Sequence, residues 1–248
     1  GGTRLSGGGV LEVNGANRLL VHGDVDVGIV TVLRESAAAE GTGHLDYRLD
    51  QTLAGPWNVP LTVGTNVTLG SAGAVFGRTL DVESGATLVV PGNQSLTFNG
   101  SISNRGTIRM FSRDVNTSLQ GSGTVFNEGT LRVEPIGGGG GFARLRVRLR
   151  NQAGATVEVR SGAQLLLASG GAIESAGRLQ VDGYLAVENV DPALVVTLTD
   201  GAGVDGSGVI RFHGSSRLIV EAPVTFAANL ELMESSRAEG AGPLRLED

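Results

Sequence analysis

One short phrase built around a glycine recurs five times in this chain, and it restricts the fold more than any other feature of the sequence. The five copies are Ser84–Leu88, Arg105–Ile108, Glu128–Leu131, Ala153–Val157 and Ala176–Leu179. Their glycines are 21, 23, 25 and 23 residues apart, and apolar side chains alternate with other residues after each of them. A fixed period with this alternation predicts stacked β-strands that each bury one face against their neighbours.

The coil between two successive glycines contains three candidate strands. Between Gly85 and Gly106 they are centred on residues 88–90, 96–98 and 102. Three short strands in a coil of about 21–25 residues are typical of the triangular cross-section of a parallel β-helix. We therefore predict an all-β parallel β-helix (a β-solenoid). About ten or eleven coils, with strands ~4.8 Å apart, give a rod on the order of 50 Å long.

The whole chain, residues 1–248, is predicted to be one β-helix domain, but some parts depart from the pattern. Residues 34–60 are predicted to form an inserted loop, which begins with a possible two-turn helix at Arg34–Glu40. Residues 227–248, where the pattern fades, are predicted to be a C-terminal cap or linker. Two shorter insertions are predicted at residues 112–118 and 137–141. Insertions in repeat proteins often carry binding functions.

Composition excludes several classes of protein. The chain has no cysteine, which rules out disulfides and thiolate metal sites. Its net charge of −6 argues against a general nucleic-acid-binding protein, which needs a basic surface. No run approaches the roughly 18 apolar residues that span a bilayer. The chain also has 40 glycines and only 4% aromatic residues, which suits a thin core with many tight turns.

Four arginines alternate with apolar residues in one predicted strand. They are Arg144, Arg146, Arg148 and Arg150. This alternation places all four guanidinium groups on the outer face of the strand. There they would form a ladder that is able to bind the carboxylate, sulfate or phosphate groups of an acidic glycan or lipopolysaccharide. The alternative is a solvated face that neighbouring coils neutralise, with Glu134 on one side and Glu158 on the other.

Two aromatic residues in the segment 34–60 are further candidates for ligand binding. Tyr47 and Trp57, the only tryptophan, could form a platform on which a sugar ring stacks. Alternatively, they anchor the inserted loop to the rod.

Candidate catalytic and metal-binding groups are few. Asp24 and Asp26 share a strand face with Glu12 expected nearby, and clustered carboxylates of this kind perform acid–base chemistry in β-helix hydrolases. The chain has no lysine to serve as the base of a lyase. The turn at Asp200–Gly208 has aspartates spaced as in some calcium-binding turns, although glycine-rich turns with aspartate are common. We predict no catalytic residues, metal site or cofactor.

The coils resemble those of known bacterial β-helix proteins. Asn104–Ile108 and Asn127–Leu131 share the pattern Asn-x-Gly-Thr-Ile/Leu, and Val10–Asn17 contains a similar glycine–asparagine phrase. Such phrases resemble the passenger regions of autotransporters and of filamentous-haemagglutinin-like adhesins. The resemblance implies a right-handed β-helix and an extracellular or cell-surface location. It also implies an adhesive or scaffolding role, with partners on a host or neighbouring cell surface.

These observations lead to two hypotheses about function. The first is a non-catalytic extracellular module that acts as an adhesin or structural scaffold, binds acidic glycans, and associates with itself end to end or laterally. The second is a polysaccharide-processing enzyme or a tailspike-like depolymerase built on a β-helix. An enzyme requires carboxylates from successive coils that converge in a cleft, whereas a scaffold presents ladders of polar residues without convergence.

Overall fold

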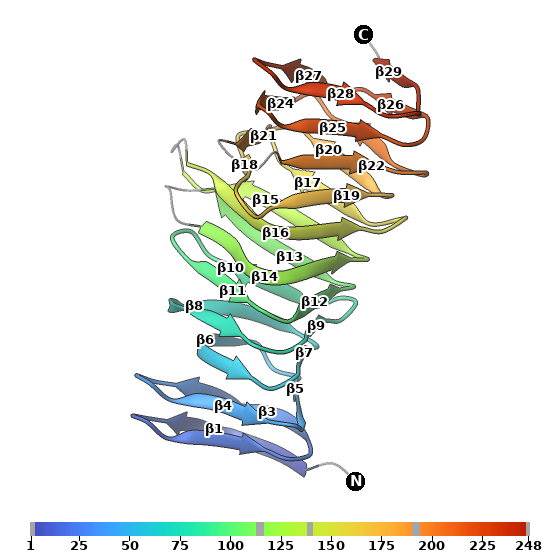
Figure 1. Cartoon of the computed structure of the whole chain (residues 1–248). Coiled ribbons are helices and arrows are strands. Elements are labelled where there is room, and N and C mark those ends of the chain that lie inside the picture. Colours follow the sequence, from blue (N-terminus) through green and yellow to red (C-terminus); the bar gives the residue numbers. More distant parts are fainter. Residues whose placement is uncertain (1–2, 113–116, 138–140, 190–193, 247–248) are drawn as a thin grey trace.

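The computed structural model describes residues 3–112, 117–137, 141–189 and 194–246, and every regular element in this part of the chain is a β-strand. The strands pair in parallel and belong to one continuous sheet, which winds into about ten turns (Figure 1). The prediction of a parallel β-helix with three strands per coil is confirmed. The described residues contain no helix that is long and apolar enough to cross a membrane.

Three stacks of strands, here called faces A, B and C, run along the rod. Six long strands bend at a corner and contribute to two faces each. From face A to face B run β1 (Thr3–Val13) and β3 (Asp24–Leu33). From face B to face C run β6 (Gln51–Asn58) and β8 (Asn66–Phe76). From face C to face A run β14 (Thr117–Asn127) and β16 (Ala143–Asn151).

The remaining strands belong to one face each. Face A contains β5 (His44–Tyr47), β7 (Leu61–Val63), β9 (Leu80–Val82), β12 (Ser101–Asn104), β19 (Ala172–Ser175), β22 (Val195–Leu198), β25 (Arg217–Val220) and β28 (Arg237–Glu239). Face B contains β10 (Thr87–Val90), β13 (Thr107–Ser112), β15 (Thr130–Pro135), β17 (Thr156–Val159), β20 (Arg178–Val181), β23 (Gly203–Asp205), β26 (Val224–Phe226) and β29 (Leu244–Leu246). Face C contains β2 (Arg18–Val21), β4 (Ala38–Gly41), β11 (Ser95–Phe98), β18 (Gln164–Leu167), β21 (Tyr184–Asn189), β24 (Val209–Gly214) and β27 (Asn229–Leu232).

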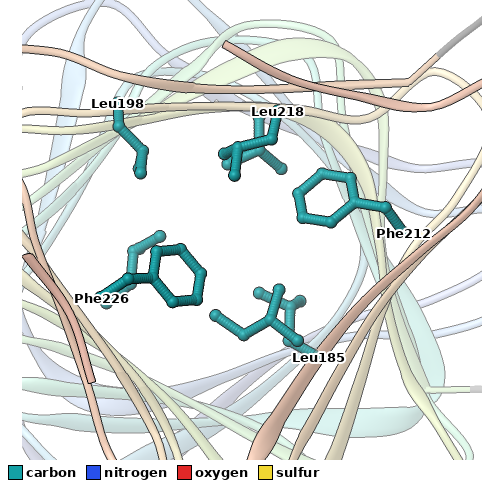
Figure 2. Close-up of a pocket in the computed structure, with 8 residues that line it drawn as sticks. Leu185, Leu198, Phe212, Leu218 and Phe226 are labelled. Carbon is teal, nitrogen blue, oxygen red and sulfur yellow. The ribbon is translucent and has the colours of Figure 1, made fainter. Parts of the chain in front are cut away.

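The interior of the rod is mostly aliphatic. On a typical strand such as β10, fully buried inward residues alternate with partly exposed outward ones. Near the C-terminal end, large apolar side chains point towards one another across the interior and leave a cavity of only about 10 Å³ (Figure 2). The labelled ones are Leu185, Leu198, Phe212, Leu218 and Phe226. That space barely accommodates one water molecule, and its lining residues are all apolar, so we expect it to be dry.

The recurring glycine serves two different purposes. A Cβ atom at Gly129 would lie 2.2 Å from the carbonyl oxygen of Gly106 in the preceding coil, so only glycine allows the two turns to approach this closely. Gly154 has a φ angle of 82°, in the left-handed region that residues with a side chain rarely adopt. The repeated phrase therefore shapes the turns and sets the spacing of the coils.

A ladder of buried amides lies at the end of face A in the middle of the rod. Asn104, Asn127 and Asn151 occupy the same inward position in successive coils, and Ser175 follows them. The Nδ2 of Asn104 donates to Oδ1 of Asn127 at 2.6 Å, and the Nδ2 of Asn127 donates to Oδ1 of Asn151 at 2.7 Å. Each asparagine also donates to a backbone carbonyl of the next coil. These paired polar groups stabilise the corner and give the Asn-x-Gly-Thr phrases a structural explanation.

Residues 34–60 do not form the inserted loop or the short helix that we expected. They contain β4, β5 and β6, which pair in register with the neighbouring coils. Ala37 and Ala39 are buried, and Ala39 pairs with Trp57 of the next coil. A run of alanines, which is typical of a helix, thus forms part of a strand here, and its small side chains leave room in the core for a large aromatic residue.

The C-terminal segment also differs from the prediction. Residues 227–248 were expected to be a cap or a linker, but β27, β28 and β29 pair with β24, β25 and β26 and form a further coil. Of the two shorter predicted insertions, residues 113–116 and 138–140 lie outside the described residues.

Candidate functional site

The arginine-rich segment forms β16, and its side chains alternate as predicted. Leu145, Val147 and Leu149 are buried, while all four arginines point outwards. However, the strand changes partners at Val147. Its first half pairs with β18 on face C, and its second half pairs with β19 on face A. We had expected the four guanidinium groups on a single face of the rod. Instead, they lie around one of its corners.

The two arginines nearest this corner differ from Arg150 at the end of the strand. Arg150 lies 3.3 Å from Glu174 of the next coil, and its guanidinium group lies over the ring of Phe126. Arg146 and Arg148 are exposed, and neither guanidinium group makes a hydrogen bond or an ion pair with any residue that the structure describes. We call Arg146 and Arg148 the arginine corner. It presents two positive charges to the solvent.

Small residues flank the arginine corner in both neighbouring coils. In the preceding coil, the register of the pairing shifts, so that the three residues Gly121–Gly123 of β14 lie opposite the single residue Val147 of β16. In the following coil the turn is made by Ala168–Gly171, where a Cβ atom at Gly170 would lie 3.4 Å from the carbonyl oxygen of Arg146. These turns contain no side chain longer than serine, so they leave both guanidinium groups accessible.

Several arginines on face B are used differently, because they pair with carboxylates. Arg109 lies 2.5 Å from Glu134, and Arg132 and Arg160 lie 2.6 and 2.8 Å from Glu158. We had considered Glu134 and Glu158 as the groups that neutralise the arginine-rich strand. That expectation is wrong, because both carboxylates lie on face B whereas β16 runs from face C to face A.

The aromatic pair lies inside the rod. Tyr47 and Trp57 are fully buried, with ring centroids 6.0 Å apart and ring planes at 85°. The Nε1 of Trp57 donates to the backbone carbonyl of Ala54 at 3.2 Å. Neither ring is available to a sugar at the surface, so the expected stacking platform is excluded. The two rings pack the core instead.

The candidate catalytic carboxylates do not converge. Asp24 and Asp26 are exposed on the part of β3 that belongs to face A, whereas Glu12 lies on face B and pairs with an arginine there. Asp205, from the turn with calcium-like spacing, lies 2.6 Å from the guanidinium group of Arg178. Among the described residues, no group of three or more His, Cys, Asp or Glu side chains is arranged to hold a metal ion.

One cluster of polar side chains that lies inside the rod was not predicted from the sequence. Thr31, Tyr47 and Gln51 all point inwards in the first coils, where most inward residues are aliphatic. Strand parity could have identified Thr31, because it lies two residues before the buried Leu33 and therefore shares its face. An uninterrupted run of β-branched residues around it hid this signal.

Comparisons of the chain with protein families, with characterised proteins and with solved structures give no match. The stacked parallel coils agree with a β-helix protein.

Proposed function

We propose that this chain is a non-catalytic extracellular β-solenoid module of a bacterial surface or secreted protein, and that it acts as an adhesin or structural scaffold. One observation carries the proposal. Arg109, Arg132 and Arg160 of face B are paired with carboxylates, whereas the arginine corner is exposed and has no partner among the described residues. Charges that tie coils together are thus separate from charges that remain available to a ligand.

The chemistry of the corner favours an acidic glycan as the ligand. Guanidinium groups bind sulfate and carboxylate oxygens bidentately, and such groups recur along acidic polysaccharides of cell surfaces. The chain's net charge of −6 provides no general attraction for a polyanion. Binding of an acidic glycan would therefore depend on a local feature, and Arg146 and Arg148 provide one because two exposed arginines lie two residues apart on the same strand.

Retention on a sulfated-glycan column tests this proposal. We expect the wild-type chain to be retained at low salt, and the variant Arg146→Ala/Arg148→Ala to elute at a clearly lower salt concentration, because two phosphate- or sulfate-type contacts are lost. The variant Arg109→Ala/Arg178→Ala is a matched control, since it removes the same charge from paired positions on face B. An equal shift for both variants, or no retention of the wild-type chain, would contradict the proposed ligand class.

The alternative of a polysaccharide-processing enzyme gains no specific support from the described residues, because Asp24 and Asp26 lie on a different face from Glu12. The two classes can be separated directly. Incubation with polyuronates and analysis of chain length should show no cleavage, and robust turnover would replace the scaffold proposal with the enzyme.

A further inference from the structure

The interior of the first three coils is less well filled than that of the C-terminal coils. A cavity of about 140 Å³ lies among β1, β2, β3 and β5, at the N-terminal end of the rod in Figure 1. Its walls are mostly leucine and valine side chains, such as Leu11, Val27 and Leu45. Leu20, which is 60% exposed, also lines it, so the cavity opens to the solvent. The C-terminal cavity in Figure 2, at about 10 Å³, offers no comparable space.

Two residues that line this cavity carry hydroxyl groups without partners. Thr31 is 1% exposed and Tyr47 is 0% exposed, and neither hydroxyl makes a hydrogen bond with the described residues. Burial raises the pKa of the Tyr47 hydroxyl, and the neighbouring Thr31 hydroxyl opposes this rise, but the geometry between them does not complete a hydrogen bond. Both groups are therefore neutral at physiological pH and open to a partner.

A third unsatisfied group lies beside them. Gln51 accepts a hydrogen bond from the backbone N–H of Thr31 at 3.3 Å through its Oε1, while its Nε2 has no partner. Buried polar groups in native proteins are almost always hydrogen-bonded, because an unsatisfied one is costly. Two unpaired hydroxyls that line an open cavity, with an unpaired amide N–H beside Thr31, indicate that something polar enters the cavity and completes the hydrogen bonds of the hydroxyls.

We propose that this cavity is a binding site for a small neutral organic molecule with an apolar body and one hydroxyl or carbonyl group. The aliphatic walls exclude charged ligands, because none of the described residues that line the cavity carries a charge that would compensate for their desolvation. The volume is close to the roughly 150 Å³ of an apolar cavity that accommodates benzene. Thr31 and Tyr47 can each donate to or accept from the ligand's oxygen, which fixes its orientation.

Cyclohexanol is a suitable probe, and methylcyclohexane is its matched control because a methyl group replaces the hydroxyl. Trp57 is the only tryptophan and lies edge-to-face against Tyr47 at 6.0 Å, so its fluorescence should report occupancy of the cavity. We expect saturable binding of cyclohexanol with a Kd on the order of 1 mM, as suits a ligand with about seven heavy atoms. Methylcyclohexane should bind at least about tenfold more weakly, because it leaves the hydroxyls unsatisfied.

A variant without the two hydroxyls tests the assignment of the site. Thr31→Val/Tyr47→Phe preserves the shape of the walls, and it should reverse the preference, with cyclohexanol weakened about tenfold and methylcyclohexane bound at least as tightly as in the wild type. Thr117→Val, at a buried threonine of a distant coil, should leave both affinities unchanged.

Ligand-observed NMR with the same two probes provides a second readout in case the fluorescence of Trp57 responds weakly. Saturable binding that follows the presence of the two hydroxyls supports the site. The absence of saturable binding in both measurements, as for a cavity that holds only water, would overturn the proposal. Equal affinities of cyclohexanol for the wild-type chain and the double variant would overturn it as well.

Discussion

Two groups of polar side chains lie inside this mostly apolar rod, and they differ in how well their hydrogen bonds are satisfied. Asn104, Asn127 and Asn151 form a ladder in the middle coils, in which amides of successive coils are joined at 2.6 and 2.7 Å. In the first coils, Thr31 and Tyr47 have hydroxyls without partners. Both groups are buried to a similar degree, so burial alone does not explain the difference.

One member of the N-terminal group, Tyr47, even shares a structural position with the ladder. Tyr47 pairs with Val63, Val63 with Val82 and Val82 with Asn104, so Tyr47 and the asparagine ladder belong to one inward column of face A. An amide carries both donors and an acceptor, and identical amides one coil apart therefore satisfy one another. A single tyrosine between valines has no such neighbour. Repetition is what makes a buried polar residue stable in a solenoid, and an isolated one needs a partner from outside the column.

The ladder itself obeys this rule at its first step. The Oδ1 of Asn104 has no hydrogen-bond partner, because the preceding position in the column is Val82. Its Nδ2 is satisfied by Asn127 and by a backbone carbonyl, so only one of its atoms is left unpaired. At the other end of the ladder, the Oγ of Ser175 accepts a hydrogen bond from the Nδ2 of Asn151 at 3.0 Å and donates one to the backbone carbonyl of Gly177.

The strongest way to break the comparison is to remove the middle of the ladder. Asn127→Ala leaves the Oδ1 of Asn151 without its donor and removes one acceptor from Asn104. We expect the free energy of unfolding to fall by about 3 kcal/mol, since buried polar groups become unsatisfied and a cavity is left. Urea denaturation measures this change.

The exposed Asn229 on β27 provides the control for that experiment. Asn229→Ala should change the free energy of unfolding by less than about 0.5 kcal/mol, as is usual for surface substitutions. A loss at Asn127 no larger than the one at Asn229 would show that the ladder does not stabilise the rod.

High pH should distinguish the two polar groups, because only the N-terminal one contains a titrating side chain. Burial raises the pKa of Tyr47 in the folded state, so the unfolded chain loses this proton first, near pH 10. Folding stability is therefore complete below about pH 10 and falls above it, by about 1.4 kcal/mol per pH unit. The chain has no lysine or cysteine, so few other groups titrate in this range.

Tyr47→Phe should abolish most of that slope. Tyr184 is the only other tyrosine, and its pKa is raised mainly by partial burial, so it leaves a smaller slope in both proteins. The measurement is the midpoint of urea unfolding between about pH 9 and 11. A slope that is the same in the wild-type chain and in Tyr47→Phe would mean that the Tyr47 hydroxyl ionises as easily in the folded state as in the unfolded one.

Much of the fold could be predicted from the sequence, because the repeated glycines mark the coils and the alternation identifies the inward residues. The segment 34–60 was misread because Ala37–Ala39 carries no alternation, and the packing of these small residues against Trp57 involves a different coil. The local sequence pattern therefore gave no indication that this segment forms strands. Strand parity correctly placed the arginines of β16 outwards. However, the alternation continues unchanged through the bend at Val147, so the position of the corner could not be predicted from it.

The ionic partners of the arginines were harder to predict for a geometric reason. Residues that face each other on neighbouring strands are about one coil apart in the sequence, as Arg150 and Glu174 are, 24 residues from each other. Glu134 lies only 10 residues before Arg144, which is less than half a coil, and so it falls on another face. The length of the coil has to be known locally before charges can be matched, and coils of 21–25 residues make that register uncertain from sequence alone.

The most delicate test compares the same substitution at two buried threonines. Thr31→Val removes a hydroxyl without a partner, so the ligand-free protein should become more stable by up to about 1 kcal/mol. Thr117→Val removes a hydroxyl that accepts from the backbone N–H of Asn93 at 3.0 Å, so it should destabilise the chain by about 1 kcal/mol. Thermal or urea unfolding of both variants gives the two signs. If Thr31→Val destabilises the protein as much as Thr117→Val does, then the Thr31 hydroxyl already has a partner, such as an ordered water, and the contrast between the two polar groups disappears.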